Sequence, residues 1–172
     1  MGSMNVLLLD RDGVLVSRRV YDYLPEHMVP LPGVVAGLQR FRDAGYRFFV
    51  LSNQSGVGRG LQTMESVIAC NDKLTRTLKE EDVHIQQCLF CPHIEEDRCN
   101  CRKPKTGMWE ELVRHHALQP SDCLMVGDRP ADIMLGNNIG CPTVLVGTTD
   151  EECPEPTYRA KDLDDLADQL LA

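Results

Sequence analysis

Short apolar runs alternate along the chain with segments in which apolar residues recur every three to four positions. The runs are typical of buried strands in a parallel sheet, and the recurring positions are typical of amphipathic helices. The strands are predicted at residues 5–9, 46–53, 84–90, 123–128 and 142–147. The helices are predicted around residues 34–41, 67–78, 109–113, 130–140 and 163–171. The second of these helices is expected to bury Val67, Ile68, Leu74 and Leu78 on one face.

Strands that alternate with helices in this way predict a doubly wound, Rossmann-like α/β fold with a mostly parallel central sheet. We find no repeat and no linker, so residues 4–172 are expected to form a single domain. Residues 1–3 are interpreted as an addition left from cloning, with Met4 as the natural start. The segment from Arg11 to Pro32 is a long loop, which is typical of functional segments.

Composition narrows the classes of partner. The chain has 172 residues, 42% of them hydrophobic, and a formal net charge of −8. That charge disfavours binding to nucleic acid, and no apolar run approaches the ~18 residues of a membrane span. No secretory signal pattern is present at the beginning, so we expect a cytoplasmic protein whose eight cysteines are reduced thiols.

Polar residues follow the first, second and fourth predicted strands, where ligands bind in folds of this class. They are Asp10, Asp12, Ser52, Asn53, Gln54, Ser55, Asp128 and, four residues later, Asp132. In an extended chain Asp10 and Asp12 point to the same side, and their repulsion needs a cation. Mg²⁺ suits such oxygen ligands, with Asp128 completing the set, and it suits phosphate esters as substrates. The alternative is that these aspartates only cap helices and turns.

A cluster of cysteines and a histidine lies between the third strand and the third helix. Cys91, His93, Cys99 and Cys101 supply three thiolates and one imidazole, which is a tetrahedral structural Zn²⁺ set with no open position. Cys88 also forms a C-x₂-C pair with Cys91 and competes with His93 as the fourth ligand. Because Cys88 falls inside the strand pattern, His93 is preferred. The basic residues Arg102 and Lys103 follow the cluster at once.

Four segments together resemble a known family. "LLLDRDGVL", "VLSNQSG", "RKPK" and "MVGDRPAD" are similar to the four ordered motifs of the haloacid dehalogenase (HAD) phosphatase superfamily. The match spans residues 5 to about 147, and the CPH and CNC elements resemble the capless branch with a zinc-bound loop. That branch contains heptose bisphosphate phosphatases and histidinol-phosphate phosphatases. The resemblance therefore implies a HAD fold with no cap domain.

The resemblance also implies a role for individual residues. Asp10 would be the nucleophile that forms an aspartyl-phosphate, and Asp12 the general acid and base. Ser52 and Lys103 would stabilise the transferring phosphoryl group. Mg²⁺ would be bound by Asp10, Asp128 and the backbone carbonyl of Asp12, while Asp132 would orient metal waters or Lys103. The substrate-binding residues would be Asn53, Gln54, Ser55, Arg102, Arg129, Arg18 and Arg19. Each arginine taken alone is more often a solvated surface charge.

The substrate is expected to be a small phosphorylated metabolite, and the protein a monomer. "SNQSGVGRG" resembles the heptose enzymes, which implies removal of the 7-phosphate of D-glycero-D-manno-heptose 1,7-bisphosphate. "GDRPADI" is closer to the histidinol-phosphate branch, which is the alternative. Val14, Val16 and Thr106 depart from the common motifs, and this leaves catalysis intact but the sugar open. A different class of function is a receiver or binding module that accepts phosphate on an aspartate.

Overall fold

The computed structural model describes residues 4–21 and 23–171, so the interpretation of residues 1–3 lies outside the described residues. The strands are β1 (Val6–Leu9), β2 (Arg47–Asn53), β3 (Ile85–Cys91), β4 (Cys123–Gly127), β5 (Thr143–Val146) and β6 (Tyr158–Ala160). The α-helices are α1 (Val34–Asp43), α2 (Met64–Glu80), α3 (Gly107–His116), α4 (Pro130–Ile139) and α5 (Leu163–Leu171). Short 3₁₀ helices cover Pro25–His27, Glu95–Asp97 and Pro120–Asp122.

The ends of the helices follow from local chemistry. The Thr63 hydroxyl accepts a hydrogen bond from the backbone N–H of Ser66 and caps α2. Asp162 caps α5 by accepting from two backbone N–H groups in its first turn. Helix α4 begins at Pro130 and ends before Gly140, which has left-handed backbone angles. These contacts and backbone angles fix one end of α2 and of α5 and both ends of α4.

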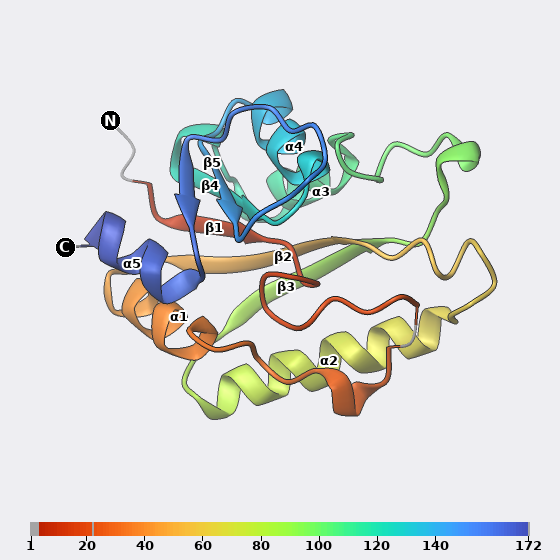
Figure 1. The fold of residues 1–172 in the computed structure, drawn as a ribbon, viewed down its shortest axis with the longest axis horizontal. Coiled ribbons are helices and arrows are strands. Elements are labelled where there is room, and N and C mark those ends of the chain that lie inside the picture. The colour runs from red at the N-terminus through yellow and green to blue at the C-terminus, as the bar shows by residue number, and fades with distance from the viewer. Residues whose placement is uncertain (1–3, 22, 172) are drawn as a thin grey trace.

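All six strands pair in parallel in the order β3-β2-β1-β4-β5-β6. Helices cover both faces of the sheet, with α1, α2 and α5 on one side and α3 and α4 on the other (Figure 1). This is the predicted doubly wound α/β fold. The direction of the strand order changes at β1 and β4, where such folds bind their ligands. The segment between β1 and α1 contains one 3₁₀ helix and, in its described residues, no separate cap domain.

Two differences from the sequence-based expectation have simple reasons. Strand β6 was not predicted, because its three residues at the edge of the sheet are only partly buried and form no apolar run. Ile68 is 47% exposed and lies outside the core, whereas its neighbour Val67 is buried. Adjacent helical residues point about 100° apart, so only one of the two faces the sheet.

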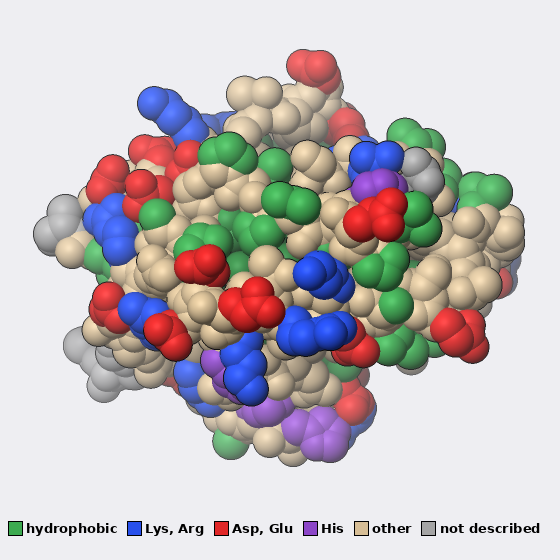
Figure 2. All heavy atoms as spheres, turned by 90° about the horizontal axis from the view of Figure 1, so that it is seen from below, with side chains coloured by type: hydrophobic (Ala, Val, Ile, Leu, Met, Phe, Trp, Pro, Cys, Tyr) green, Lys and Arg blue, Asp and Glu red, His purple; other side chains and the backbone are tan. Residues whose placement is uncertain are grey.

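The surface shows side chains of both charges. Seen from below, acidic and basic side chains are interspersed among apolar ones rather than collected into one continuous basic area (Figure 2). Across the described residues, no helix is both long and apolar enough to cross a membrane.

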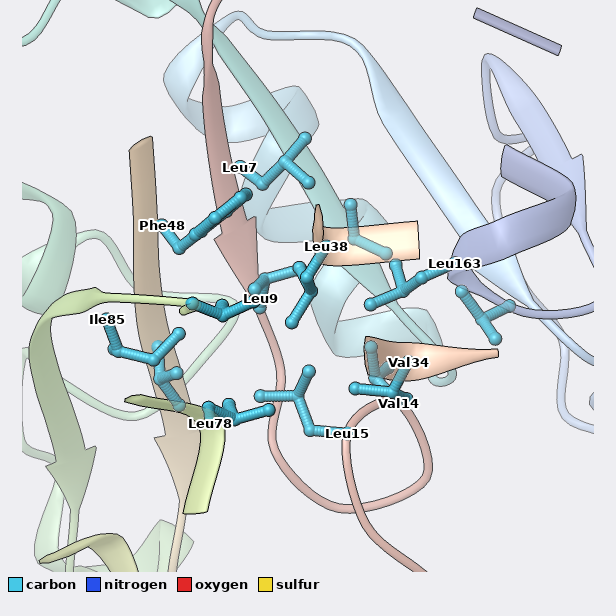
Figure 3. Packing of buried hydrophobic residues seen from close by; sticks show 14 of the residues in the cluster. Leu7, Leu9, Val14, Leu15, Val34, Leu38, Phe48, Leu78, Ile85 and Leu163 are labelled. Carbon is cyan, nitrogen blue, oxygen red and sulfur yellow. The ribbon is translucent and has the colours of Figure 1, made fainter. Parts of the chain in front are cut away.

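The strand β1 lies at the centre of two hydrophobic cores. Leu7 and Leu9 point to the face covered by α1, α2 and α5, where they join Leu38 and Leu163 (Figure 3). Residues Val6 and Leu8 of the same strand point to the opposite face, against side chains of α3 and α4 such as Trp109 and Leu135. Because β1 is buried on both faces, the residues that follow it have a fixed position at the rim of the sheet.

Candidate active site

A cavity of about 560 Å³ opens at the carboxyl ends of the central strands. Asp10 follows β1, Asn53 ends β2, and Asp132 lies in the first turn of α4 after β4. All three line the cavity, together with Lys103 from the loop before α3. The structure thus brings together motif residues that are far apart in the sequence.

Lys103 joins two of the carboxylates. Its Nζ donates to Asp10 Oδ1 at 2.9 Å, to Asp132 Oδ1 at 2.6 Å and to the backbone oxygen of Leu51 at 2.7 Å. The side chain is 3% exposed, and this burial lowers its pKa. The charges of Asp10 and Asp132 outweigh burial and raise the pKa of Lys103 above its ordinary value. The ammonium group is therefore charged and fixed beside the predicted nucleophile.

Asp128 completes a group of three carboxylates. One oxygen of each of Asp10, Asp128 and Asp132 lies within 4.8 Å of the others, a spacing that could hold a metal ion. Burial, followed by the charge of Asp10, raises the pKa of Asp128 to about 6, although Arg18 opposes this. Burial and Asp10 likewise raise the pKa of Asp132 to about 7 despite Lys103. The site therefore has an excess of negative charge that favours a cation.

Gly13 explains the glycine of the first motif. Its φ is +88°, a left-handed conformation that side chains rarely adopt, and a Cβ at this position would overlap the Asp128 carboxylate. Only glycine lets the loop after β1 approach Asp128 this closely. The conformation turns the backbone oxygen of Asp12 toward the same region, as its 2.9 Å contact with Arg18 Nη2 shows.

The Asp12 side chain is held by three N–H donors. Arg11 donates from Nε to Oδ1 at 3.0 Å and from Nη2 to Oδ2 at 3.2 Å, and Gln54 Nε2 donates to Oδ2 at 2.7 Å. The same Gln54 amide donates to Ser52 Oγ at 3.2 Å. Ser52 is 1% exposed and is not among the residues that line the cavity. Gln54, predicted among the substrate-binding residues, thus contacts the predicted acid and base directly.

Sequence reasoning missed the residues behind Asp12. Arg11 is fully buried, donates from Nη1 to Asn71 Oδ1 at 3.0 Å, and lies over the Tyr23 ring at 4.8 Å from its centroid. Asn71 is a buried polar residue of α2. A charged residue between two motif aspartates gave a weak signal for Arg11, whereas nothing in the pattern of α2 pointed to Asn71.

Asn53 fixes the backbone on either side of Lys103. Its side-chain amide donates to the Lys103 carbonyl at 3.1 Å, and its Oδ1 accepts from the Lys103 N–H at 2.9 Å. Asn53 also lines the cavity, as does Ser55. The end of β2 therefore holds the loop that carries the lysine, in addition to any contact with a ligand.

Arginines form much of the cavity wall. They are Arg18, Arg19, Arg59, Arg102 and Arg129. The Arg18 guanidinium donates to both oxygens of the Asp128 carboxylate. Arg102 Nη1 is buried and has no hydrogen-bond partner within the described residues. A buried N–H without a partner is costly.

The four predicted zinc ligands come together beside this cavity. Cys91 Sγ lies 3.6 Å from Cys99 Sγ and 3.5 Å from His93 Nδ1, which is 3.3 Å from Cys101 Sγ. A tetrahedron with Zn–S bonds of about 2.3 Å has edges of about 3.8 Å, and the shorter Zn–N bond shortens the edges to the histidine, so the spacing fits the ion. The competing ligand Cys88 lies elsewhere, with its sulfur 3.6 Å from Thr75 Oγ1.

The thiols of this cluster differ in acidity. Burial raises the pKa of the Cys91 thiol above its ordinary value. For Cys99, hydrogen bonds from the Arg102 backbone N–H and from neighbouring thiols outweigh burial and lower the pKa to about 7. The Arg102 N–H donates to Cys99 Sγ at 3.4 Å, so the cluster is connected directly to the residue before Lys103.

Comparisons with known proteins show which family the chain belongs to. A family model described as HAD-hydrolase-like matches residues 100–169. A D-glycero-beta-D-manno-heptose-1,7-bisphosphate 7-phosphatase of Pseudomonas putida is 32% identical over 175 residues, which cover 98% of this chain and 100% of that protein. The chain belongs to the HAD phosphatase family. It resembles the heptose bisphosphate phosphatases over its whole length.

Two further relatives bear on the substrate of this HAD phosphatase. A crystal structure of a D,D-heptose 1,7-bisphosphate phosphatase from B. bronchiseptica, complexed with magnesium and phosphate, has a TM-score of 0.88 and 31% identity, and 98% of each chain is covered. A histidine biosynthesis bifunctional protein of Campylobacter jejuni is 31% identical over 141 residues, covering 80% of this chain and 40% of that protein.

Proposed function

We propose that this HAD phosphatase hydrolyses a small sugar phosphate through an aspartyl-phosphate, with D-glycero-D-manno-heptose 1,7-bisphosphate as substrate and its 7-phosphate as the group removed. The observation that carries the proposal is the buried Lys103 between Asp10 and Asp132, next to Asp128. A carboxylate beside a fixed ammonium can attack phosphorus while the charge on the phosphoryl oxygens is stabilised.

In the first step an Asp10 oxygen bonds to phosphorus, and the bond from phosphorus to the sugar oxygen breaks. Asp12 donates a proton to that leaving oxygen. In the second step Asp12 accepts a proton from water as the water attacks the aspartyl-phosphate, which releases phosphate and restores Asp10. Gln54 and Arg11 hold the Asp12 carboxylate, and Lys103 faces Asp10 throughout.

The donor set of the cavity fits Mg²⁺. The carboxylates of Asp10 and Asp128 and the backbone oxygen of Asp12 are hard oxygen ligands, and all three surround one cationic nitrogen of Arg18. Bound here, Mg²⁺ neutralises and orients phosphoryl oxygens. Asp132 serves the site through Lys103. The B. bronchiseptica relative, solved with magnesium and phosphate, supports this assignment.

The arginines support a substrate with a second phosphate. Arg102 and Arg129 line the cavity beside Lys103 and Asp132, and Arg19 lines it as well. Arg102 Nη1 lacks a hydrogen-bond partner in the described residues, so this guanidinium has a donor left for an anionic group once its side chain turns toward the cavity. Hydrogen bonds to charged groups contribute about 1.5–3 kcal/mol each, so a bisphosphate gains affinity here that a monophosphate does not.

Histidinol phosphate is the second candidate, because the Campylobacter jejuni relative acts in histidine biosynthesis. Histidinol phosphate carries an ammonium group beyond its phosphate. Away from the aspartates, the cavity wall contains five arginines and one glutamate, Glu151, so the net positive charge there disfavours binding of an ammonium group. The charge of the wall therefore favours the heptose bisphosphate.

We also propose that Cys91, His93, Cys99 and Cys101 bind a structural Zn²⁺. All four ligand positions come from the protein, which leaves no position for a substrate. The ion would brace the loop that carries Arg102 and Lys103, and its contribution to activity would be indirect. The spacing of the ligand atoms and the bond from the Arg102 N–H to Cys99 support this role.

For the molecule as a whole, we infer one domain over residues 4–172 that acts as a cytoplasmic monomer on a small metabolite. None of the eight cysteines forms a disulfide, which suits a reducing compartment. The net charge of −8 and the mixed charges of Figure 2 argue against nucleic acid as a partner. Size-exclusion chromatography with light scattering tests the monomer.

The deciding experiment compares phosphate release from the heptose bisphosphate and from histidinol phosphate, both with Mg²⁺. We expect kcat/KM to be about 10–100-fold higher for the bisphosphate, as one additional charged contact predicts. Phosphorus NMR should identify the product as the 1-phosphate. Asp10→Asn should abolish release while the fold is retained. Equal or better turnover of histidinol phosphate would overturn the substrate, and an active Asp10→Asn would overturn the mechanism.

A further inference from the structure

The guanidinium of Arg18 lies on the oxygen atoms that the proposed function assigns to Mg²⁺. Its Nη2 is 2.7 Å and 2.9 Å from the two carboxylate oxygens of Asp128, and 2.9 Å from the backbone oxygen of Asp12. It is also 3.9 Å from Asp10 Oδ2. One nitrogen thus contacts all three members of the donor set.

We propose that Arg18 is an internal competitor for the magnesium site, so that its guanidinium must leave before the ion can bind. The inference rests on the proposed function. Mg²⁺ needs its oxygen ligands at about 2.0–2.1 Å and in nearly octahedral directions. A nitrogen that already sits 2.7 Å from Asp128 and 2.9 Å from Asp12 leaves no room for the ion among the same oxygens.

The charges around Arg18 show why its guanidinium is stable on these oxygens. Asp10, Asp128 and Asp132 face one another, and Lys103 neutralises Asp10 and Asp132 from the zinc-loop side. Arg18 comes from the loop between β1 and α1, and its guanidinium forms an ion pair with Asp128. Two cations then offset two of the three negative charges, and exchange of Arg18 for Mg²⁺ adds the third positive charge.

Arg18 is able to leave because it belongs to the loop between β1 and α1 and its side chain is 37% exposed. It also lines the cavity. When Mg²⁺ displaces it, the guanidinium stays on the wall that faces an anionic ligand. Metal binding therefore frees a binding group for the anion, and by reciprocity the anion favours binding of the metal.

A fixed salt bridge makes a different prediction from a competitor. If Arg18 only braces Asp128, then Arg18→Ala loses stability with and without Mg²⁺, and it gains no affinity for the ion. If Arg18 competes, its removal weakens the metal-free protein but strengthens binding of Mg²⁺. The opposite signs of these two effects separate the two cases.

The test is a titration of the full chain with MgCl₂ in a calorimeter, after dialysis that removes Mg²⁺ and leaves the zinc site filled. If Arg18 covers the donors about 90% of the time, Arg18→Ala should bind Mg²⁺ about tenfold more tightly. Its melting temperature should lie below that of the wild type without Mg²⁺. At saturating Mg²⁺ the two should differ by no more than about 1 °C.

Arg59→Ala is the matched control. It removes the same charge from the same cavity wall, but the Arg59 guanidinium lies 5.8 Å above the Tyr21 ring rather than on the carboxylates. Its Mg²⁺ affinity should stay within about twofold of the wild type, since an exposed charge that does not contact the donor oxygens is largely screened. A gain equal to that of Arg18→Ala would mean that only net charge matters, and it would overturn the inference.

Two further results of the titration separate failure of this inference from failure of the proposed function. If the wild type binds Mg²⁺ and releases phosphate, but Arg18→Ala binds the ion no more tightly, the competitor is refuted and the proposed function stands. If neither protein binds Mg²⁺, the proposed function falls and the inference falls with it.

Discussion

Replacing Lys103 by methionine removes the ammonium group that joins Asp10 and Asp132 while keeping the length and volume of the buried side chain. Two carboxylates are then left facing each other in the interior. We expect a loss of stability that depends on pH, together with a fall in kcat of about 10²–10³-fold from the lost stabilisation of phosphoryl charge.

The size of the effect follows from the contacts. Lys103 Nζ lies 2.9 Å from Asp10 and 2.6 Å from Asp132, so each contact contributes roughly 6 kcal/mol at an effective dielectric constant of about 20, before desolvation. The cost of burying the charges offsets most of this. Removing one partner of a buried pair typically costs about 3–5 kcal/mol, because a buried charge remains unpaired.

One carboxyl can reduce this cost by taking up a proton. The pKa of Asp132 is already raised to about 7, above the unfolded value of about 3.9, so its ionised form is disfavoured in the folded protein. Stability that comes from the protonated form is present at low pH and is lost as the pH rises through about 7. We therefore expect Lys103→Met to cost about 3–4 kcal/mol at pH 8 and about 1–2 kcal/mol at pH 6.

The assay is urea unfolding followed by circular dichroism at both pH values without added Mg²⁺. Lys105→Met is the matched control. This lysine is exposed, and its Nζ donates to the backbone carbonyl of Cys99 rather than to a carboxylate. We expect it to change stability by no more than about 0.5 kcal/mol at either pH. An equal loss for Lys103→Met at pH 6 and pH 8 would refute the reasoning about the carboxyl group.

Three other predictions address the loop, the zinc cluster and the substrate. Gly13→Ala should cost about 1–3 kcal/mol in thermal unfolding, because of its left-handed φ and its overlap with Asp128; unchanged stability would contradict the packing. Chelation should release one zinc per chain and lower both stability and turnover. Cys99→Ser should have the same effect, whereas the control Cys153→Ser should not. If protein produced in zinc-supplied cells contained no zinc, the structural role of the ion would be excluded. Arg102→Ala should raise KM for the bisphosphate about tenfold but leave kcat/KM for the 7-monophosphate unchanged, and equal losses on both would place Arg102 elsewhere.

The central strands and their polar ends could be predicted because burial on both faces leaves continuous apolar runs. Asp10 and Asp128 follow such runs, and parallel strands bring their carboxyl ends to one rim. The edge strand Tyr158–Ala160 escaped prediction because partial burial leaves no run. In α2 the sequence offered two adjacent apolar residues, and only packing selected Val67 over Ile68.

The contacts within the site were harder to predict than its members. Arg11 and Asn71 are 60 residues apart and meet through one hydrogen bond, which leaves no periodic trace in the sequence. Gln54 and Asn53 were expected to bind substrate, yet the structure also joins them to Asp12 and to the Lys103 backbone. The tertiary structure determines which groups a buried polar side chain bonds to, and these partners cannot be read from a single sequence.

The two candidate metal sites differ in how far apart their ligands lie along the chain. Cys91 is two residues from His93, and His93 is eight from Cys101. Asp10 and Asp128, by contrast, are 118 residues apart. Short loops close at a lower entropic cost and far sooner than long ones. During synthesis, the zinc cluster can therefore form while β4 is still missing, whereas the carboxylates assemble only after β4 has paired with β1. Zinc uptake would then report an early stage of folding, and magnesium binding its completion.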